Sequence, residues 1–309
     1  MHHRLQSHLH AEAAARTLFR ELIAPISSTL ALADIHDLVL MPDDVLRYVP
    51  FAALQDGQRY LIESFAVSVV TPAAPARGSP PGEVSRTAAA LGVSRTPDGQ
   101  AWLPNVPAEL HRVVRQSPSD RYGALPGIIL LDRAFTREAA RQVLASGYPV
   151  VHIASHFVFR PTSLADSYLL LGDGTHLTLE RIKDNTWPLR DVEILTLSAC
   201  DTAIGDADAD GREIESFAAV VQRQGVRSVL ASLWSVPDLS TSVLMAKFYA
   251  TLARSRDSDA AHAAAIRAAQ LLLLRGPDRG SLASDQATAH SPYADPYYWA
   301  GFVLLRSPT

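Results

Sequence analysis

The chain has a single cysteine, Cys200 in the stretch LTLSACDT, and a pair of histidines upstream in the stretch HIASHFVF. A thiolate attacks carbonyl carbon atoms well, but a free thiol has a pKa of about 8.5 and is mostly protonated at neutral pH. A cysteine nucleophile therefore needs an imidazole or another cation nearby. His156 precedes Cys200 by 44 residues, which leaves room for one strand and its crossover. Cys200 is thus either a nucleophile paired with His156 or, as free cysteines commonly are, a small apolar core residue.

His152 and His156 are four residues apart, which is the histidine spacing of the zinc motif H-E-x-x-H. That motif requires a helix and a glutamate after the first histidine, whereas residue 153 of this chain is isoleucine. The surrounding PVVHIA is rich in β-branched residues and predicts a strand, on which the two side chains stand roughly 13 Å apart. We therefore expect no metal site, interpret His152 as a packed, hydrogen-bonded strand residue, and keep His156 as the candidate base.

Other motifs for acyl transfer or phosphate binding are missing from the sequence. LSACDTA is not G-x-S-x-G, and neither G-x-G-x-x-G nor G-x-x-x-x-G-K occurs, so no cofactor is expected. LLGDGTHL instead predicts a hairpin turn at Asp173–Gly174. The aspartates of GDADADGRE resemble the start of a calcium loop, but no glutamate completes the pattern at the required place. We interpret this stretch as a solvated loop.

Strands and helices alternate regularly in the second half of the chain. Apolar runs predict strands at 127–131, 150–154, 168–171, 193–197 and 228–233, and helices are predicted at 136–146, 214–224 and 239–252. The first half adds a helix at 11–31, strands at 38–41 and 66–70, and a helix within LPNVPAELHRVV. This alternation predicts a mostly parallel sheet covered by helices on both faces. Ligands of such sheets bind beyond the carboxyl ends of the strands, where His156 and Cys200 both fall.

The composition is that of an ordinary folded protein. Of the 309 residues, 48% are hydrophobic and 19% are charged, which is typical of one large domain or two small ones. The net charge of -4 gives no global basic field, so neither nucleic acid nor an anionic membrane surface is expected as a partner. A single cysteine forms no internal disulfide, and no apolar run is long enough for a membrane span or a signal peptide. We therefore expect a cytoplasmic protein.

Six stretches, in order along the chain, resemble segments of the CHAT family of caspase-like cysteine peptidases, whose clan includes caspases, separases and gingipains. LVLMPDDVLRYVPFAAL resembles the opening strand of the family, VVHIASHFVF its histidine motif and LTLSACDTAIG its cysteine motif. LPNVPAEL, GVRSVLASLWSVPDLSTSVLMAKFY and PYYWAGFVLL resemble further segments. The resemblance covers roughly Leu38 to Leu305 and implies a three-layer α/β/α caspase-like sandwich. We accordingly divide the chain into a helical lead-in at 1–35 and a CHAT peptidase domain at 36–309.

The resemblance implies a role for each residue that matches the motifs of the family. His156 is then the general base, and Cys200 is the nucleophile that forms a thioester with the carbonyl of the scissile bond. The backbone N–H groups of Phe157 and Cys200 are expected to form the oxyanion hole. Relatives commonly have glycine at the position of Phe157. Either this branch accepts phenylalanine because the required φ is negative, or the oxyanion hole is impaired.

Three further residues are candidates for substrate binding, and each has a structural alternative. Trp234 is either an apolar platform for a peptide or a core residue. Asp238 is either a polar contact for the substrate or the N-cap of the helix that follows it. Asp201 either favours a basic residue before the cleaved bond or ties down its own loop.

The resemblance implies a cysteine endopeptidase that cleaves a specific protein substrate, in a bacterial signalling or defence pathway. The alternative is a catalytically silent interaction module, because a fold does not by itself imply an activity. Members of the family often carry TPR repeats, so a separate sensor or TPR-type protein is an expected partner. GDADADGRE and the polar stretch at 275–292 are expected to gate the site.

Overall fold

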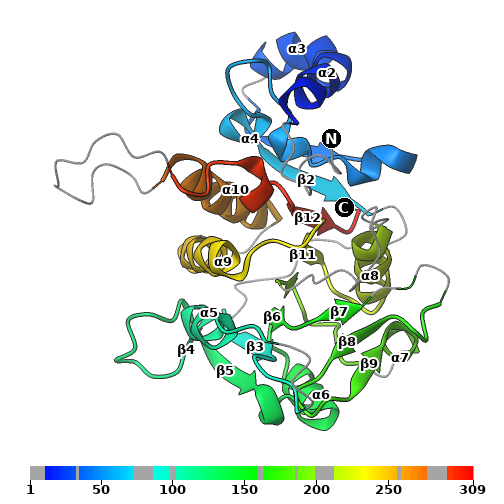
Figure 1. The fold of residues 1–309 in the computed structure, drawn as a ribbon, viewed down its shortest axis with the longest axis vertical. Coiled ribbons are helices and arrows are strands. Elements are labelled where there is room, and N and C mark those ends of the chain that lie inside the picture. The colour runs from blue at the N-terminus through cyan, green and yellow to red at the C-terminus, as the bar shows by residue number, and fades with distance from the viewer. Residues whose placement is uncertain are drawn as a thin grey trace.

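The computed structural model of the chain describes residues 11–32, 35–71, 86–97, 102–158, 160, 163–184, 187–198, 212–255, 259–276 and 291–308. These residues form one large sheet with helices on both of its faces, and a second, smaller sheet (Figure 1). The predicted three-layer α/β/α sandwich with a mostly parallel central sheet is therefore confirmed.

The large sheet contains nine strands. From one edge to the other they are β1 (Asp37–Leu40), β2 (Ala66–Val70), β12 (Phe302–Arg306), β11 (Ser228–Ser232), β10 (Ile194–Leu197), β6 (Val150–Ala154), β3 (Ala88–Gly92), β5 (Leu125–Leu131) and β4 (Val114–Arg115). All neighbouring strands run parallel except β11 and β12. The central strands β3, β6, β10 and β11 are buried along their whole length, as expected of parallel strands covered on both faces.

Two layers of helices enclose this sheet. Helices α5 (Val106–Val113), α9 (Asp238–Leu252) and α10 (Asp259–Arg275) lie on one face (Figure 1). Helices α6 (Arg137–Ala145), α7 (Leu179–Lys183) and α8 (Arg212–Arg223) lie on the other. Strand side chains alternate between the two layers, because successive residues of a strand point to opposite faces. Val151 and Ile153 of β6 line an apolar cavity together with residues of α6, α7 and α8. His152 between them therefore faces the layer of α5 and α9.

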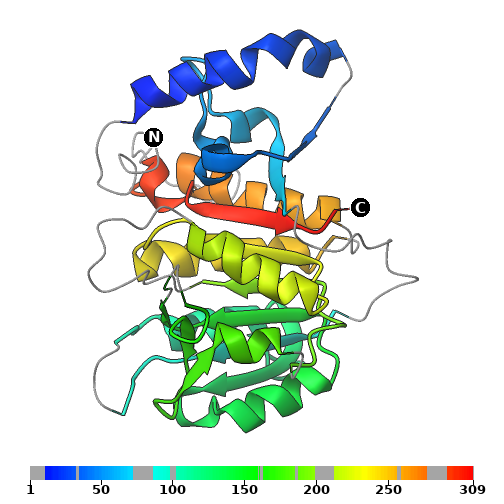
Figure 2. The same ribbon diagram turned by 90° about the vertical axis from the view of Figure 1, so that its right-hand side faces the viewer.

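The N-terminal segment packs at the end of the sheet formed by β1 and β2 (Figure 2). One helix was predicted at 11–31, whereas the structure has α2 (Glu12–Leu22), the 3-10 turn η1 (Ala24–Ile26) and α3 (Ser27–Leu32). Pro25 explains the interruption, since proline lacks the N–H of a continuous helix and fits at a helix start. Short helical turns follow β1, namely η2 (Asp44–Tyr48), η3 (Phe51–Ala53) and α4 (Leu61–Ser64).

The second sheet follows directly on the chain segment that contains His156. It consists of β7 (Phe157–Val158), β8 (Tyr168–Leu170) and β9 (His176–Thr178), all antiparallel. The turn between β8 and β9 has Gly174 at φ 83° and Asp173 accepting a hydrogen bond from the Thr175 N–H at 3.0 Å. The predicted hairpin turn at Asp173–Gly174 is confirmed.

Candidate functional site

His156 lies two residues beyond the carboxyl end of β6, and its side chain is half-buried. Its position is fixed from the small sheet, because its carbonyl oxygen accepts a hydrogen bond from the Leu170 N–H at 2.9 Å. The neighbouring Ser155 hydroxyl donates to the Leu170 carbonyl at 2.6 Å. The backbone at His156 is thus held between the end of β6 and strand β8.

The strand that leads to the cysteine is the direct neighbour of β6. β10 pairs with β6 in parallel, with Thr196 opposite His152, and the Ser198 N–H then donates to the Ile153 carbonyl at 3.0 Å. Cys200 and Asp201 lie outside the described residues, as does the rest of 199–211. The structure therefore brings the carboxyl end of the histidine strand beside Ser198, two residues before the cysteine.

Phe157 is a fully buried residue whose ring packs edge-to-face on Phe217 of α8, with centroids 5.2 Å apart. Among the described non-glycine residues only Asp132 has a positive φ, so the backbone at Phe157 does not require glycine. Phe157 is opposite Leu169 in the pairing of β7 with β8. The hydrogen bond from the Leu170 N–H to the His156 carbonyl makes this a non-hydrogen-bonded pair, so the Phe157 N–H is directed away from β8.

The substrate-binding candidates that the structure describes have well-defined structural roles. Trp234 has no exposed surface, and its indole N–H donates to the Tyr297 carbonyl at 2.9 Å. This burial favours the core alternative over an accessible platform. Asp238 is the first residue of α9 rather than its N-cap, which is Pro237. Its carboxylate accepts a hydrogen bond from the Asn105 N–H at 2.9 Å and so joins the start of α9 to the start of α5.

A network of buried polar side chains lies between strands β6 and β10 and helices α5 and α9, before the carboxyl ends of the two strands. His152 has no exposed surface, and its Nδ1 is 3.0 Å from the Tyr249 hydroxyl, which donates to the Thr196 hydroxyl at 2.8 Å. On the other side of the ring, His152 Nε2 is 2.9 Å from Glu109 Oε1 and 3.4 Å from Ser198 Oγ. Burial raises the pKa of the Tyr249 hydroxyl far above its ordinary value; the Glu109 charge adds to this rise and the hydrogen bond to Thr196 opposes it. The interpretation of His152 as a packed, hydrogen-bonded strand residue is confirmed.

Two members of this network, Glu109 and Tyr249, were not predicted from the sequence. Glu109 is 1% exposed although it is a glutamate on α5. It shares the buried stripe of that helix with Val106, Leu110 and Val113. An acidic residue at an apolar spacing was therefore the available signal, since buried carboxylates need a partner. Tyr249 gave no comparable signal, because most of α9 is apolar.

Asp132 marks a second polar point at the same edge of the sheet, directly after β5. It adopts φ 51°, a left-handed conformation that is uncommon for residues other than glycine. Its carboxylate accepts hydrogen bonds from the N–H of Ser94 at 2.6 Å and the N–H of Arg95 at 3.1 Å, beyond the end of β3. The Ser94 hydroxyl also donates to it at 2.8 Å. Asp132 thus fixes the loops after β3 and β5.

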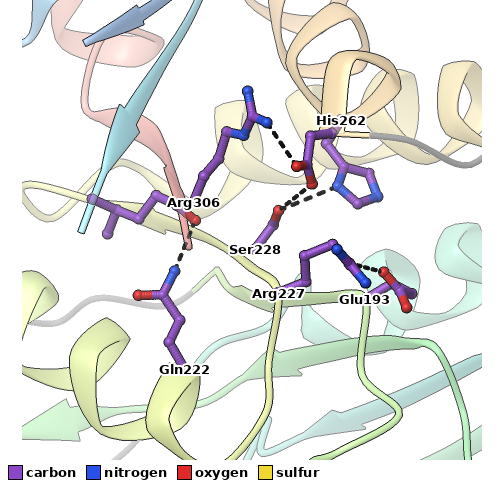
Figure 3. Close-up of polar contacts among 8 residues, drawn as sticks. Glu193, Gln222, Arg227, Ser228, His262 and Arg306 are labelled. Atoms are coloured by element: carbon purple, nitrogen blue, oxygen red, sulfur yellow. Dashed lines mark hydrogen bonds and ion pairs between the residues drawn. The ribbon is translucent and has the colours of Figure 1, made fainter. Parts of the chain in front are cut away.

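The opposite, amino end of the central strands carries a different set of polar contacts (Figure 3). Arg227 pairs with Glu193 at 2.5 Å, and Arg306 of β12 pairs with Asp259 of α10 at 2.6 Å. Asp259 also accepts a hydrogen bond from Ser228 at 3.5 Å. These contacts join strand starts to α10 and β12, and we interpret them as structural because they lie at the amino ends, away from His156.

The described residues contain no group of three or more His, Cys, Asp and Glu side chains that could hold a metal ion. Within the same residues, no helix has both the length and the apolar character needed to cross a membrane.

Comparison with known proteins assigns the chain to a family. The sequence model of the CHAT domain matches residues 12–307. This chain belongs to the CHAT domain family. The resemblance inferred from the histidine and cysteine motifs is therefore confirmed. The match begins within the segment 1–35 that we set apart as a lead-in, and the boundary at residue 35 stays a prediction. No curated protein sequence matches the chain.

Two solved structures are similar to this CHAT domain protein in fold. One is the crystal structure of the Arg-specific cysteine proteinase gingipain R (RgpB), with a TM-score of 0.43 and 10% identity over 72% of this chain. The other is the complex of the pro- and mature domains of RgpB from Porphyromonas gingivalis, with a TM-score of 0.48 and 9% identity. That match covers 99% of this chain and 74% of the other. The chain spans 46% of the length of the first structure.

Proposed function

We propose that this protein is a cysteine endopeptidase in which Cys200 is the nucleophile and His156 the general base. The observation that carries the proposal is the pairing of β6 with β10, in a family assigned by sequence. Neighbouring strands are about 4.8 Å apart, so side chains that follow their carboxyl ends lie within reach of each other. Loops at this edge are also where sheets of this kind bind their ligands.

The proposed reaction proceeds in two steps. His156 takes the proton of the Cys200 thiol, and the thiolate sulfur attacks the carbonyl carbon of the scissile peptide bond. The protonated His156 then gives this proton to the leaving amine as the C–N bond breaks, which leaves a thioester on Cys200. Water, deprotonated by His156, hydrolyses the thioester and frees the thiol. In both steps the negative oxygen of the tetrahedral intermediate needs hydrogen-bond donors.

The donors we propose are the backbone N–H groups of Phe157 and Cys200. The backbone conformation of Phe157 supports this role. Its φ is not positive, so a side chain at this position costs no left-handed strain. The buried contact of its ring with Phe217 holds that backbone in place. The phenylalanine that replaces the usual glycine is thus compatible with an intact oxyanion hole.

The proposed substrate is a protein cut at one or few sites in a signalling or defence pathway, with a separate sensor or TPR-type protein as partner. Asp201 remains a candidate for selecting a basic residue before the cleaved bond. Asp238 already accepts a hydrogen bond from Asn105, so we assign it a supporting role at the start of α9.

The test is the appearance of new peptide N-termini when a peptide library is incubated with the protein at high concentration. We expect products that share a residue before the cut and that disappear with Cys200→Ala. A wild-type protein that yields no more products than Cys200→Ala, under reducing conditions and long incubation, refutes the proposal. That result favours the alternative of a silent interaction module.

A further inference from the structure

The Glu109–His152–Tyr249–Thr196 network connects four elements below the proposed catalytic pair. Glu109 comes from α5, His152 from β6, Tyr249 from α9 and Thr196 from β10. His152 and Thr196 are direct partners in the pairing of β6 with β10, and the Tyr249 hydroxyl contacts both side chains. One phenolic oxygen thus joins the two strands from the helix side of the sheet.

The Tyr249 hydroxyl links His152 to Thr196 by two hydrogen bonds. The Tyr249 hydroxyl has one hydrogen and donates it to the Thr196 hydroxyl, so it accepts from the Nδ1–H of His152. His152 Nε2 then faces Glu109 Oε1 at 2.9 Å. This is an ion-pair contact, and Glu109 Oε1 has no hydrogen-bond partner among the described residues. Both side chains are almost completely buried, at 0% and 2% exposure, so removing either one leaves the polar group of the other buried without this contact.

The network contacts the strands that lead to the proposed catalytic residues. Thr196 and Ser198, four and two residues before Cys200, both contact side chains of the network. Ser198 Oγ is 3.4 Å from His152 Nε2, so the contact reaches to two residues before Cys200. A displacement of β10 relative to β6 would therefore move Cys200 relative to His156.

We propose that Glu109, His152 and Tyr249 are positioning residues for the Cys200–His156 pair, an inference that rests on the proposed function. They hold the ends of β6 and β10 in register, so that the thiol stays within hydrogen-bond distance of the imidazole. Activation of a thiol depends on this geometry, and a displacement of about 1 Å costs on the order of 100-fold in rate. The network acts on the pair through these strands.

The test measures the reactivity of the cysteine rather than cleavage. Cys200 is the only cysteine, so the rate of alkylation by iodoacetamide reports on this thiol alone. The rate is measured against pH for the folded wild type, Tyr249→Phe and a control, Gln270→Leu. Gln270 donates buried hydrogen bonds to the Trp299 and Phe302 carbonyls at 3.0 Å, so its loss weakens the same helical layer away from β6 and β10. Melting temperatures show that each variant is folded.

We expect wild-type Cys200 to titrate below about 8.5, the value of a free thiol. In Tyr249→Phe the apparent pKa should rise towards 8.5 and the rate at pH 7 should fall roughly tenfold, since a rise of about one unit lowers the thiolate fraction by that factor. Gln270→Leu should lower the melting temperature and leave the titration unchanged. If Tyr249→Phe fails to fold, Tyr249→Phe with Thr196→Val removes both partners of one buried bond and is measured instead.

Each other outcome overturns the inference in a distinguishable way. If Tyr249→Phe titrates like the wild type, the network is only structural, while the proposed function stands. If Gln270→Leu loses as much reactivity as Tyr249→Phe, general loosening explains the effect and no positioning role exists. If wild-type Cys200 titrates near 8.5 and His156→Ala changes nothing, the proposed function fails and the inference fails with it.

Discussion

Replacing Phe157 by glycine should destabilise the protein strongly, even though the resemblance to the family implies glycine at this position. The ring is fully buried and packs on Phe217, so its removal leaves a cavity. Truncating a buried phenylalanine to alanine costs about 3–5 kcal/mol, and glycine in a strand costs about 0.5–1 kcal/mol more. The free energy of unfolding should thus fall by about 4–6 kcal/mol. At roughly 2 °C per kcal/mol for a chain of this size, the melting temperature should fall by about 8–12 °C.

Urea unfolding followed by circular dichroism measures this loss, with Phe157→Leu and Tyr122→Ala as controls. Phe157→Leu keeps most of the apolar volume and should cost much less. Tyr122 is 87% exposed, so its truncation should change stability by no more than about 0.5 kcal/mol. Urea unfolding resolves differences of about 1 kcal/mol. If the free energy of unfolding of Phe157→Gly lies within about 1 kcal/mol of the wild-type value, the ring does not pack as the structure has it. The support that we draw from Phe157 for an ordered oxyanion hole is then lost.

Cys200→Ala and His156→Ala should each abolish peptide cleavage with little change in melting temperature. The double variant should lose little more activity than either single variant, because the pair acts as a unit. Measurable cleavage by Cys200→Ala together with a large loss of stability would contradict this. Arg306→Met should lower the free energy of unfolding by about 2 kcal/mol, because it removes the charged partner of Asp259 at 2.6 Å and leaves only the Ser228 contact, in a place where both charged side chains are largely buried. A loss under about 0.5 kcal/mol in urea unfolding would show that the pair is no stronger than a surface contact. The purified chain should cut casein far more slowly than about 1 per second, since a competent state that awaits its partner is sparsely populated; faster turnover without a partner would mean a constitutive protease.

The parts of the fold that were predicted are those whose pattern is local. β2 and β6 begin and end at the predicted residues, because short apolar runs rich in valine and isoleucine fit buried parallel strands. Helix α10 was not predicted. Its alanines and leucines are buried on several sides against α9 and the sheet, so they give no single apolar stripe. The tertiary environment of a helix, rather than its own periodicity, decides such a case.

The location of the candidate site at the strand ends was predicted from the sequence, but the buried side chains that support it were not. The position of His156 after β6 followed from the sequence because the strand is unambiguous. The contact of His152 with Tyr249 joins residues 97 positions apart, and no spacing rule connects them. Trp234 was ambiguous for a similar reason, since an aromatic residue after a strand suits a platform and a core equally well. The contact of the Trp234 indole with the Tyr297 carbonyl, 63 residues further along the chain, decides between the two.

The catalytic pair is tested most directly by reaction with a peptidyl acyloxymethyl ketone, followed by mass spectrometry of the digested protein. A competent Cys–His pair forms one stable thioether, and we predict a single adduct on the peptide that contains Cys200. Formation of this adduct should become much slower in His156→Ala. A folded wild-type protein that forms no adduct with any peptide in a varied set of these ketones, or His156→Ala reacting as fast as the wild type, would contradict the assignment of Cys200 and His156 as a catalytic pair.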